Sequence, residues 1–252
     1  MIELNKLYHC DCMELMKEIP DKFFELAIVD PPYGGGATNN SSEELSGGGV
    51  QTGRIKKDQD SAGGLTSTIS AARTGGSGRK YQVHAGGIFD KDIRHWDIAP
   101  PPEYFKELAR VSQNQIIWGG NYFDLPPTRC FIVWRKKNIP LEGFSMAPVE
   151  YAWTSFNDNA AQFEAFSSGG SGREERFHPT QKPVALYEWL LTRYAKKGDK
   201  ILDTHAGSAS SLIACHNMGF DFVGCEIDDV YYKLANERLQ AAQAQLSLWR
   251  NE

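Results

Sequence analysis

The residues best suited to chemistry are a carboxylate, two prolines and a tyrosine that follow one another as Asp30-Pro31-Pro32-Tyr33. They come directly after Leu26-Ala27-Ile28-Val29, a continuous apolar run of the kind that forms a buried strand of a parallel sheet. Open α/β sheets bind ligands outside the carboxyl ends of their strands, and prolines cannot continue a hydrogen-bonded ladder. The pattern therefore predicts a carboxylate and an aromatic ring at a ligand-binding edge, although a strand that ends at an ordinary proline turn has the same composition.

A second group of candidate residues lies near the carboxyl end of the chain. Asp203 ends a short apolar run, a glycine turn with Gly207 and Ser208 follows, and a predicted helix over 209–218 leads to a strand that ends at Glu226. Glu226 lies 23 residues beyond Asp203, the spacing at which a carboxylate reaches ribose hydroxyls in a Rossmann-like site. The turn lacks the full G-x-G-x-x-G pattern, which argues against a dinucleotide.

Two more segments place polar residues beside predicted helices. Asp11 precedes a predicted helix over 12–19 and suits its N-cap, with Cys12 next to it after a predicted strand over 7–10. Thr180 and Lys182 precede a predicted helix over 184–196, where Pro183 suits the first turn. Read alone, Thr180 is a helix cap and Lys182 a solvated charge.

Together, these motifs resemble those of the DNA amino-methyltransferases, which transfer a methyl group from S-adenosylmethionine to the exocyclic amine of adenine or cytosine. The resemblance covers Asp30 to Tyr33, His178-Pro179-Thr180-Gln181-Lys182-Pro183, the turn at 203–208 and Glu226. It implies that Asp30, Pro31, Pro32 and Tyr33 are catalytic. It also implies a cofactor site, with Asp11 and Cys12 at the adenine, Thr180 and Lys182 at the methionine carboxylate, Asp203, Gly207 and Ser208 at the glycine turn, and Glu226 at the ribose.

The catalytic strand comes first and the cofactor strand late, as in the permuted class of this family that is often called beta. The expected fold is an α/β, Rossmann-like methyltransferase sheet of one domain over 1–252, mostly parallel, with a circularly permuted motif order. Between the two halves, a helix preceded by the prolines at 100–102 should bury its apolar side chains, namely Tyr104, Phe105, Leu108 and Val111. Three strands should follow over 115–118, 130–134 and 149–156, the last as an antiparallel edge.

Target-recognition insertions are expected between the halves, over 34–95 and 138–177. The first is rich in glycine, and its stretch 50–87 has six basic against two acidic residues, a balance that suits DNA phosphates or a solvated loop equally. The four-residue sequence Gly-Gly-Ser-Gly at 75–78 occurs again at 169–172, as it would if both were engineered linkers.

Composition indicates a globular protein of ordinary hydrophobic content, 41%, with a net charge of −5. No apolar run is long enough to span a membrane, and the amino terminus lacks the form of a signal peptide, so we expect a cytoplasmic location. Five cysteines without paired C-x-x-C spacing and six scattered histidines favour neither disulfides nor a metal site.

The favoured function is methylation of the N6 amino group of adenine in double-stranded DNA, with S-adenosylmethionine as cofactor. The base must be flipped out of the duplex, with Tyr33 stacked on it and Asp30 and the carbonyl of Pro31 accepting the amino hydrogens. Two alternatives remain open. One is methylation of cytosine at N4, although that branch more often has Ser at the position of Asp30. The other is a catalytically inactive DNA-binding module. A homodimer and a partner nuclease of a restriction-modification pair rest on the resemblance alone.

Overall fold

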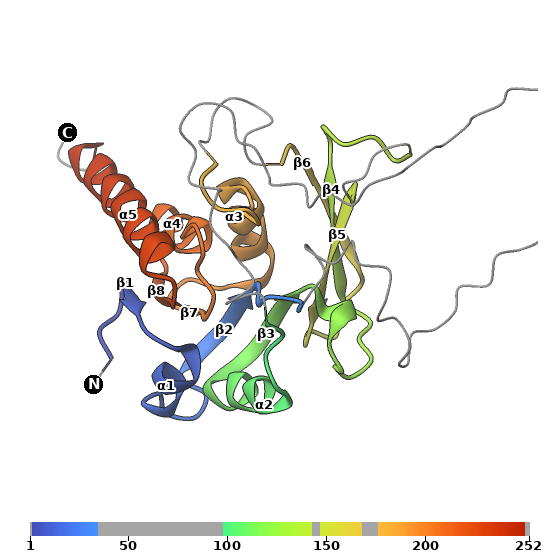
Figure 1. Ribbon diagram of the computed structural model, residues 1–252, viewed down its shortest axis with the longest axis horizontal. Helices are drawn as coiled ribbons and strands as arrows, with labels where there is room; N and C mark the ends of the chain where they lie inside the picture. Colours follow the sequence, from blue (N-terminus) through green and yellow to red (C-terminus); the bar gives the residue numbers. More distant parts are fainter. Residues whose placement is uncertain (1, 35–97, 143–146, 168–175, 250–252) are drawn as a thin grey trace, which may run out of the picture.

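The computed structural model describes residues 2–34, 98–142, 147–167 and 176–249. Its described part is built from three layers, a central sheet with helices α1 and α2 on one face and α3, α4 and α5 on the other (Figure 1). The sheet has eight strands in the order β1-β8-β7-β2-β3-β5-β4-β6. This confirms the expected α/β, mostly parallel class.

Five neighbouring strands run parallel and form the half of the sheet that carries the predicted motifs. They are β1 (Lys6–His9), β8 (Asp221–Glu226), β7 (Lys200–Asp203), β2 (Phe24–Val29) and β3 (Ser112–Trp118). The early strand β2 pairs directly with the late strand β7, which is the permuted order expected from the motifs. Because the five strands are parallel, their carboxyl ends lie at one edge of the sheet.

The other three strands correct the expected position of the antiparallel strand. Strand β5 (Val149–Thr154) is antiparallel as expected, but it lies between β3 and β4 (Phe131–Lys136) and is not an edge. The edge is β6 (Ala161–Ala165), which the sequence analysis did not identify and which pairs parallel to β4. Nearness in sequence indicated that β4 and β5 pair, but it did not show on which side the next neighbours join.

Helices α1, α2, α3 and α4 lie close to the predicted ranges, whereas α5 and a short 3₁₀ helix were not predicted. Asp11 caps α1 (Cys12–Lys17), because its carboxylate accepts the backbone N–H groups of Met13 and Glu14 at 2.7 and 3.2 Å. Helix α2 covers Pro102–Val111, α3 Val184–Tyr194, α4 Ser210–Met218 and α5 Asp229–Trp249, and a short 3₁₀ helix, η2, covers Gly120–Tyr122.

Two apolar cores hold the layers together, one on each face of the sheet. Under α1 and α2, the buried side chains include Met16, Phe24 and, as predicted for α2, Tyr104, Leu108 and Val111, while Phe105 is only partly buried. Under α3, α4 and α5, they include Ile28, Trp118, Trp134, Leu186 and Phe222. Burying each such side chain contributes roughly 1.5–3 kcal/mol.

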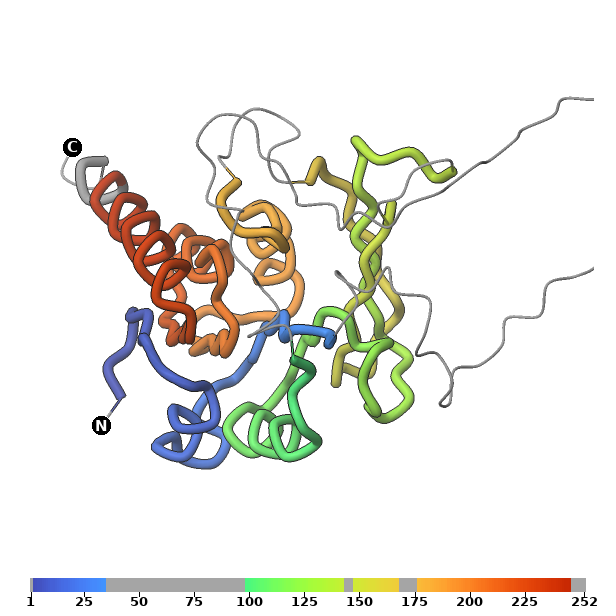
Figure 2. The backbone as a smooth tube through the Cα atoms, in the orientation of Figure 1, coloured from blue at the N-terminus to red at the C-terminus, as the bar shows by residue number. Residues whose placement is uncertain are grey.

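The two predicted insertions differ in how much of them is described. Residues 35–97, which hold nearly all of the first, lie outside the described residues, as do both Gly-Ser tetrads and the basic stretch 50–87. The second, 138–177, contains β5 and β6, so part of it belongs to the sheet (Figure 2). Among the described residues, no helix is both long and apolar enough to cross a membrane.

Candidate active site

Three of the acidic residues predicted from the sequence lie at the carboxyl ends of parallel strands. Asp30 follows β2, Asp203 ends β7 and Glu226 ends β8, and these strands are neighbours in the sheet. Apolar, fully buried strands end here at polar side chains because this edge is where the chain leaves the core. The topology thus brings the expected catalytic and cofactor residues to one edge.

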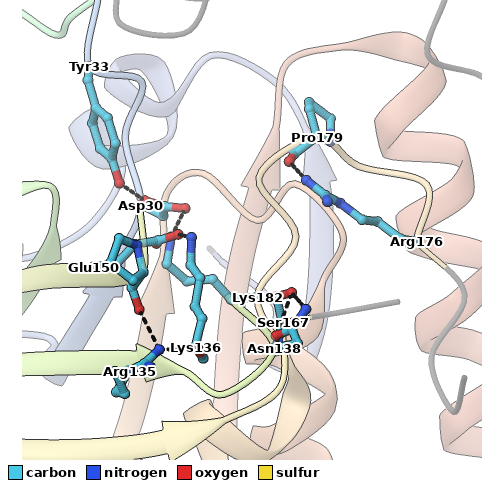
Figure 3. A network of polar contacts seen from close by, with 11 residues as sticks. Asp30, Tyr33, Arg135, Lys136, Asn138, Glu150, Ser167, Arg176, Pro179 and Lys182 are labelled. Carbon is cyan, nitrogen blue, oxygen red and sulfur yellow. Dashed lines mark hydrogen bonds and ion pairs between the residues drawn. The ribbon is translucent and has the colours of Figure 1, made fainter. Parts of the chain in front are cut away.

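Asp30 is held from both sides by predicted site residues (Figure 3). The Tyr33 hydroxyl donates a hydrogen bond to Oδ1 of Asp30 at 2.8 Å, and the Lys182 ammonium pairs with Oδ2. The side chain of Lys182 is 2% exposed and that of Asp30 13%, so this ion pair is largely removed from water. The structure therefore places Lys182 at the carboxylate of Asp30, a contact that its motif did not indicate.

Lys182 also joins a group of residues that the sequence analysis missed. Its Nζ atom lies 3.1 Å from Oε2 of Glu150 and 5.1 Å from the ring centroid of Trp118, and Glu150 in turn pairs through Oε1 with Lys136 at 2.6 Å (Figure 3). Glu150 is near the start of β5, and because β5 is antiparallel its start, not its end, lies beside the carboxyl ends of β3 and β4. Applying that rule to the predicted antiparallel strand would have identified Glu150.

Burial and neighbouring charges shift the pKa values of Asp30, Lys182 and Glu150. Burial raises the pKa of Asp30, Lys182 opposes the rise and the charge of Glu150 adds to it, with a raised pKa as the result. Burial also disfavours a charge on Lys182, but the two carboxylates outweigh it and raise the Lys182 pKa. For Glu150, the two lysine ammonium groups outweigh burial and lower the pKa. Glu150 and Lys182 are therefore charged near neutral pH.

The ring of Tyr33 is surrounded by aromatic side chains and by a glycine. It stacks on Tyr122 at 4.8 Å between centroids and 16° between planes, and it meets Phe123 edge-on at 6.1 Å. Gly119 has φ +66°, and a Cβ atom there would come within 2.0 Å of the Tyr33 ring. Tyr122 is 61% exposed, so an aromatic platform opens to solvent beside Asp30.

The cofactor side of the edge is built around Asp203 and the glycine turn. The Asp203 carboxylate accepts the backbone N–H of His205 at 3.0 Å and the hydroxyl of Ser211, yet burial raises its pKa to about 7. Gly207 has φ +51°, and its N–H donates to Oε2 of Glu226 at 3.0 Å. Glu226 thus ties the end of β8 to the turn after β7.

The remaining predicted cofactor residues have local partners in this structure. Asp11 caps α1, as described above, and the Sγ atom of Cys12 lies 4.0 Å from Nε2 of His205. Burial raises the pKa of the Cys12 thiol to about 12. Thr180 lies with its Oγ1 3.2 Å from Nδ1 of His178, and Ser208 with its Oγ 3.1 Å from that of Ser210. Their roles toward a cofactor stay predictions.

The sheet and its acidic edge are those of a Rossmann-like methyltransferase. The model of the DNA methylase family N6_N4_Mtase matches residues 95–237, more than half of the chain, so the chain belongs to this family of DNA methyltransferases. This confirms the resemblance drawn from the motifs, and with it S-adenosylmethionine as the cofactor that the family uses.

Known relatives agree with this assignment along most of the chain. Type II methyltransferase M2.DpnII of Streptococcus pneumoniae is 24% identical over 93% of this chain and 89% of its own length. Type II methyltransferase M2.LlaDCHI of Lactococcus lactis subsp. cremoris is 25% identical over 92% and 88%. Among solved structures, the PvuII DNA methyltransferase, described as cytosine-N4-specific, covers 95% of this chain and 91% of its own with a TM-score of 0.52 at 11% identity, which shows a shared fold.

Proposed function

We propose that the protein methylates the N6 amino group of adenine in double-stranded DNA, with S-adenosylmethionine as the methyl donor. The observation that carries the choice of base is Asp30 itself, a carboxylate at the first position of Asp-Pro-Pro-Tyr, where the cytosine branch of the family more often has Ser. The Tyr33 hydroxyl and Lys182 hold that carboxylate at the ligand-binding edge.

The residues along β7 and β8 fit the cofactor. Asp203 offers a buried carboxylate to the cationic methionine end, Gly207 permits close approach of the backbone, and Glu226 stands where ribose hydroxyls are bound in Rossmann-like sites. When bound, S-adenosylmethionine supplies an electrophilic methyl group on its sulfonium.

The chemistry required of the chain is to make a poor nucleophile attack. The lone pair of an adenine amino group is delocalised into the ring, and accepting its hydrogens returns electron density to nitrogen. A carboxylate has about four lone-pair sites, so Asp30 can accept an amino hydrogen although each of its oxygens already has one partner. The carbonyl of Pro31 accepts the second hydrogen. The nitrogen would take the methyl group as the carbon–sulfur bond of the donor breaks and its electron pair stays on sulfur, and the surplus proton of the nitrogen would leave through Asp30.

The base reaches this edge after it has left the helical stack, at a cost of a few kcal/mol. Tyr33 offers it a stacking surface, which in this structure is partly occupied by Tyr122. We also propose that the segments 34–95 and 138–177 select the target sequence. A homodimer and a partner nuclease remain proposals, the latter supported by relatives named type II methyltransferases.

The direct test is to incubate unmodified double-stranded DNA with the protein and S-adenosylmethionine and to identify the modified nucleoside by mass spectrometry, with long-read sequencing for the target. N6-methyladenine is the expected product. N4-methylcytosine would replace the proposal by its nearest alternative, for which the likeness to the PvuII enzyme is the supporting observation. No transfer to either base would favour a DNA-binding module.

Asp203 predicts a pH dependence of cofactor binding. Because its pKa is raised to about 7, the carboxyl is protonated at pH 6 and becomes ionised as the pH rises through 7. A cationic ligand prefers the ionised form, so affinity should rise roughly tenfold between pH 6 and pH 7.5, following the ionised fraction. Calorimetric titration with S-adenosylmethionine measures this. Asp203→Asn should bind weakly and without that slope, and a persisting slope would assign the titration to another group.

Two substitutions at Tyr33 should lower turnover and DNA binding to different extents. Tyr33→Phe keeps the ring and loses the hydrogen bond to Asp30, worth about 0.5–1.5 kcal/mol, so turnover should fall a few-fold. Tyr33→Ala also loses base stacking, about 1–3 kcal/mol, so binding of DNA with a flipped base should weaken as well. Fluorescence of 2-aminopurine at the target position, combined with single-turnover rates, separates the two. Equal defects in both variants would exclude a stacking role.

A further inference from the structure

Four buried or half-buried charges alternate in sign along one line, beginning at the catalytic carboxylate. Asp30 pairs with Lys182, Lys182 with Glu150, and Glu150 with Lys136 (Figure 3). The four come from the loop after β2, the loop before α3, β5 and β4, in that order. Burying one ion pair is already costly in free energy. Two buried ion pairs in series are stable only if their geometry and hydrogen bonds are good. The outer pair, Glu150 and Lys136, has no part in the proposed reaction as described so far.

The Lys182 ammonium is divided between two carboxylates. One N–H reaches Oδ2 of Asp30, another lies toward Oε2 of Glu150 at 3.1 Å, and the indole face of Trp118 is 5.1 Å away. If Glu150 carried no charge, Lys182 would have Asp30 as its one carboxylate partner among the described residues. It would then neutralise Asp30 more fully and draw Oδ2 toward itself.

We propose that Glu150 is a positioning residue for methyl transfer, which shares the Lys182 ammonium with Asp30 so that the Asp30 carboxylate stays oriented and incompletely neutralised. This inference rests on the proposed function and adds a residue to it. Lys136 completes the arrangement, because it lies 2.6 Å from the other oxygen of Glu150 and compensates its charge. Glu150 acts through Lys182 and does not touch the base in this account.

The Glu150→Gln variant tests the proposal, because it removes the charge and keeps the shape. The rate constant for transfer with both substrates saturating should fall roughly ten- to hundredfold, as expected when a reacting group is slightly misplaced. The dissociation constants for S-adenosylmethionine and DNA should stay within a factor of two or so of wild type, because the binding surfaces are unchanged.

The pH profile separates positioning from loss of structure. In the part of the chain that the structure describes, the titratable groups that act on Asp30 are Tyr33 from its own loop, Lys182 from the loop before α3, Tyr187 from α3, Glu150 from β5 and Asp203 from β7. Glu150 raises the pKa of Asp30, so removing its charge should move the acid limb of the rate profile to lower pH. Partial unfolding would lower the rate without moving the limb in that direction.

Glu25→Gln is the matched control. Glu25 pairs with Lys200 at 3.1 Å and is 28% exposed, against 27% for Glu150, but it lies at the start of β2, the end of that strand away from Asp30. It should leave both the rate and the acid limb unchanged. If Glu150→Gln does not fold, Glu150→Asp takes its place, because it keeps the charge on a shorter side chain. This variant should lower the rate of methyl transfer and move the acid limb of the pH profile less than complete loss of the charge would.

A titration that needs no activity keeps this inference separate from the proposed function. The ¹³Cγ signal of Asp30, assigned by its loss in Asp30→Asn, should titrate at lower pH in Glu150→Gln than in wild type. If the wild-type protein is inactive but the titration of Asp30 shifts in this way, the proposed function is wrong, while the electrostatic coupling of Glu150 to Asp30 stands. Wild-type rate and an unmoved limb in Glu150→Gln, with active wild-type protein, would overturn the role of Glu150.

Discussion

Replacing Asp30 with alanine should lower the rate of methyl transfer about a hundred- to a thousandfold, the usual cost of losing one preorganised group that acts on charge in the transition state. Asp30 accepts an amino hydrogen most strongly while positive charge develops on nitrogen, so its contribution is concentrated in that step. Both dissociation constants should therefore change far less than the rate. Single-turnover transfer with saturating DNA and S-adenosylmethionine measures the first quantity, and calorimetry the others.

The control for Asp30→Ala is Asp21→Ala. Asp21 pairs with Arg110 at 2.8 Å but is 77% exposed and precedes β2, away from the carboxyl edge. It should retain the wild-type rate. Because Lys182 keeps Glu150 as a partner when Asp30 is replaced, the Asp30 variant should remain folded. Near wild-type transfer by Asp30→Ala would refute the catalytic assignment of the whole Asp-Pro-Pro-Tyr run.

Strands β2, β7 and β8 of the parallel half could be predicted because each is mostly apolar and ends at or just before an acidic residue. Asp30, Asp203 and Glu226 were identified in this way, and the pairing of β2 with β7 brings their strands together. Where a buried strand ends depends on residues that are adjacent in the chain, so a short stretch of sequence is enough to predict it. The N-cap role of Asp11 was predictable for the same reason.

The antiparallel half shows why the rest could not be predicted. Strand β6 alternates apolar and polar residues but is only five residues long, and its pairing with β4 joins segments whose contact no local pattern encodes. The same is true of Lys182, whose motif gives its position in the chain but not its partners, Asp30 after β2 and Glu150 on β5. Tyr122 likewise meets Tyr33 through the turn at Gly119, 86 residues along the chain from Tyr33. Contacts between distant elements require the assembled sheet.

Replacing Lys182 with methionine should lower the free energy of unfolding by about 3–5 kcal/mol, because it leaves buried carboxylates without their shared cation. Methionine has a similar length, so little packing is lost and the effect reports charge. Urea-induced unfolding at neutral pH, followed by circular dichroism, measures it. The loss should be larger than for most single substitutions because Lys182 is 2% exposed and serves both Asp30 and Glu150.

Two further variants show whether the buried charge is the cause. Lys200→Met removes a lysine from the partly exposed pair with Glu25 and should cost at most about 1 kcal/mol. In Lys182→Met, Glu150 keeps its ion pair with Lys136 while Asp30 loses its lysine partner, so adding Asp30→Asn removes the uncompensated charge and the double variant should be more stable than Lys182→Met alone. If the second change instead destabilises the protein further, the loss in Lys182→Met comes from packing against Trp118 and not from uncompensated charge.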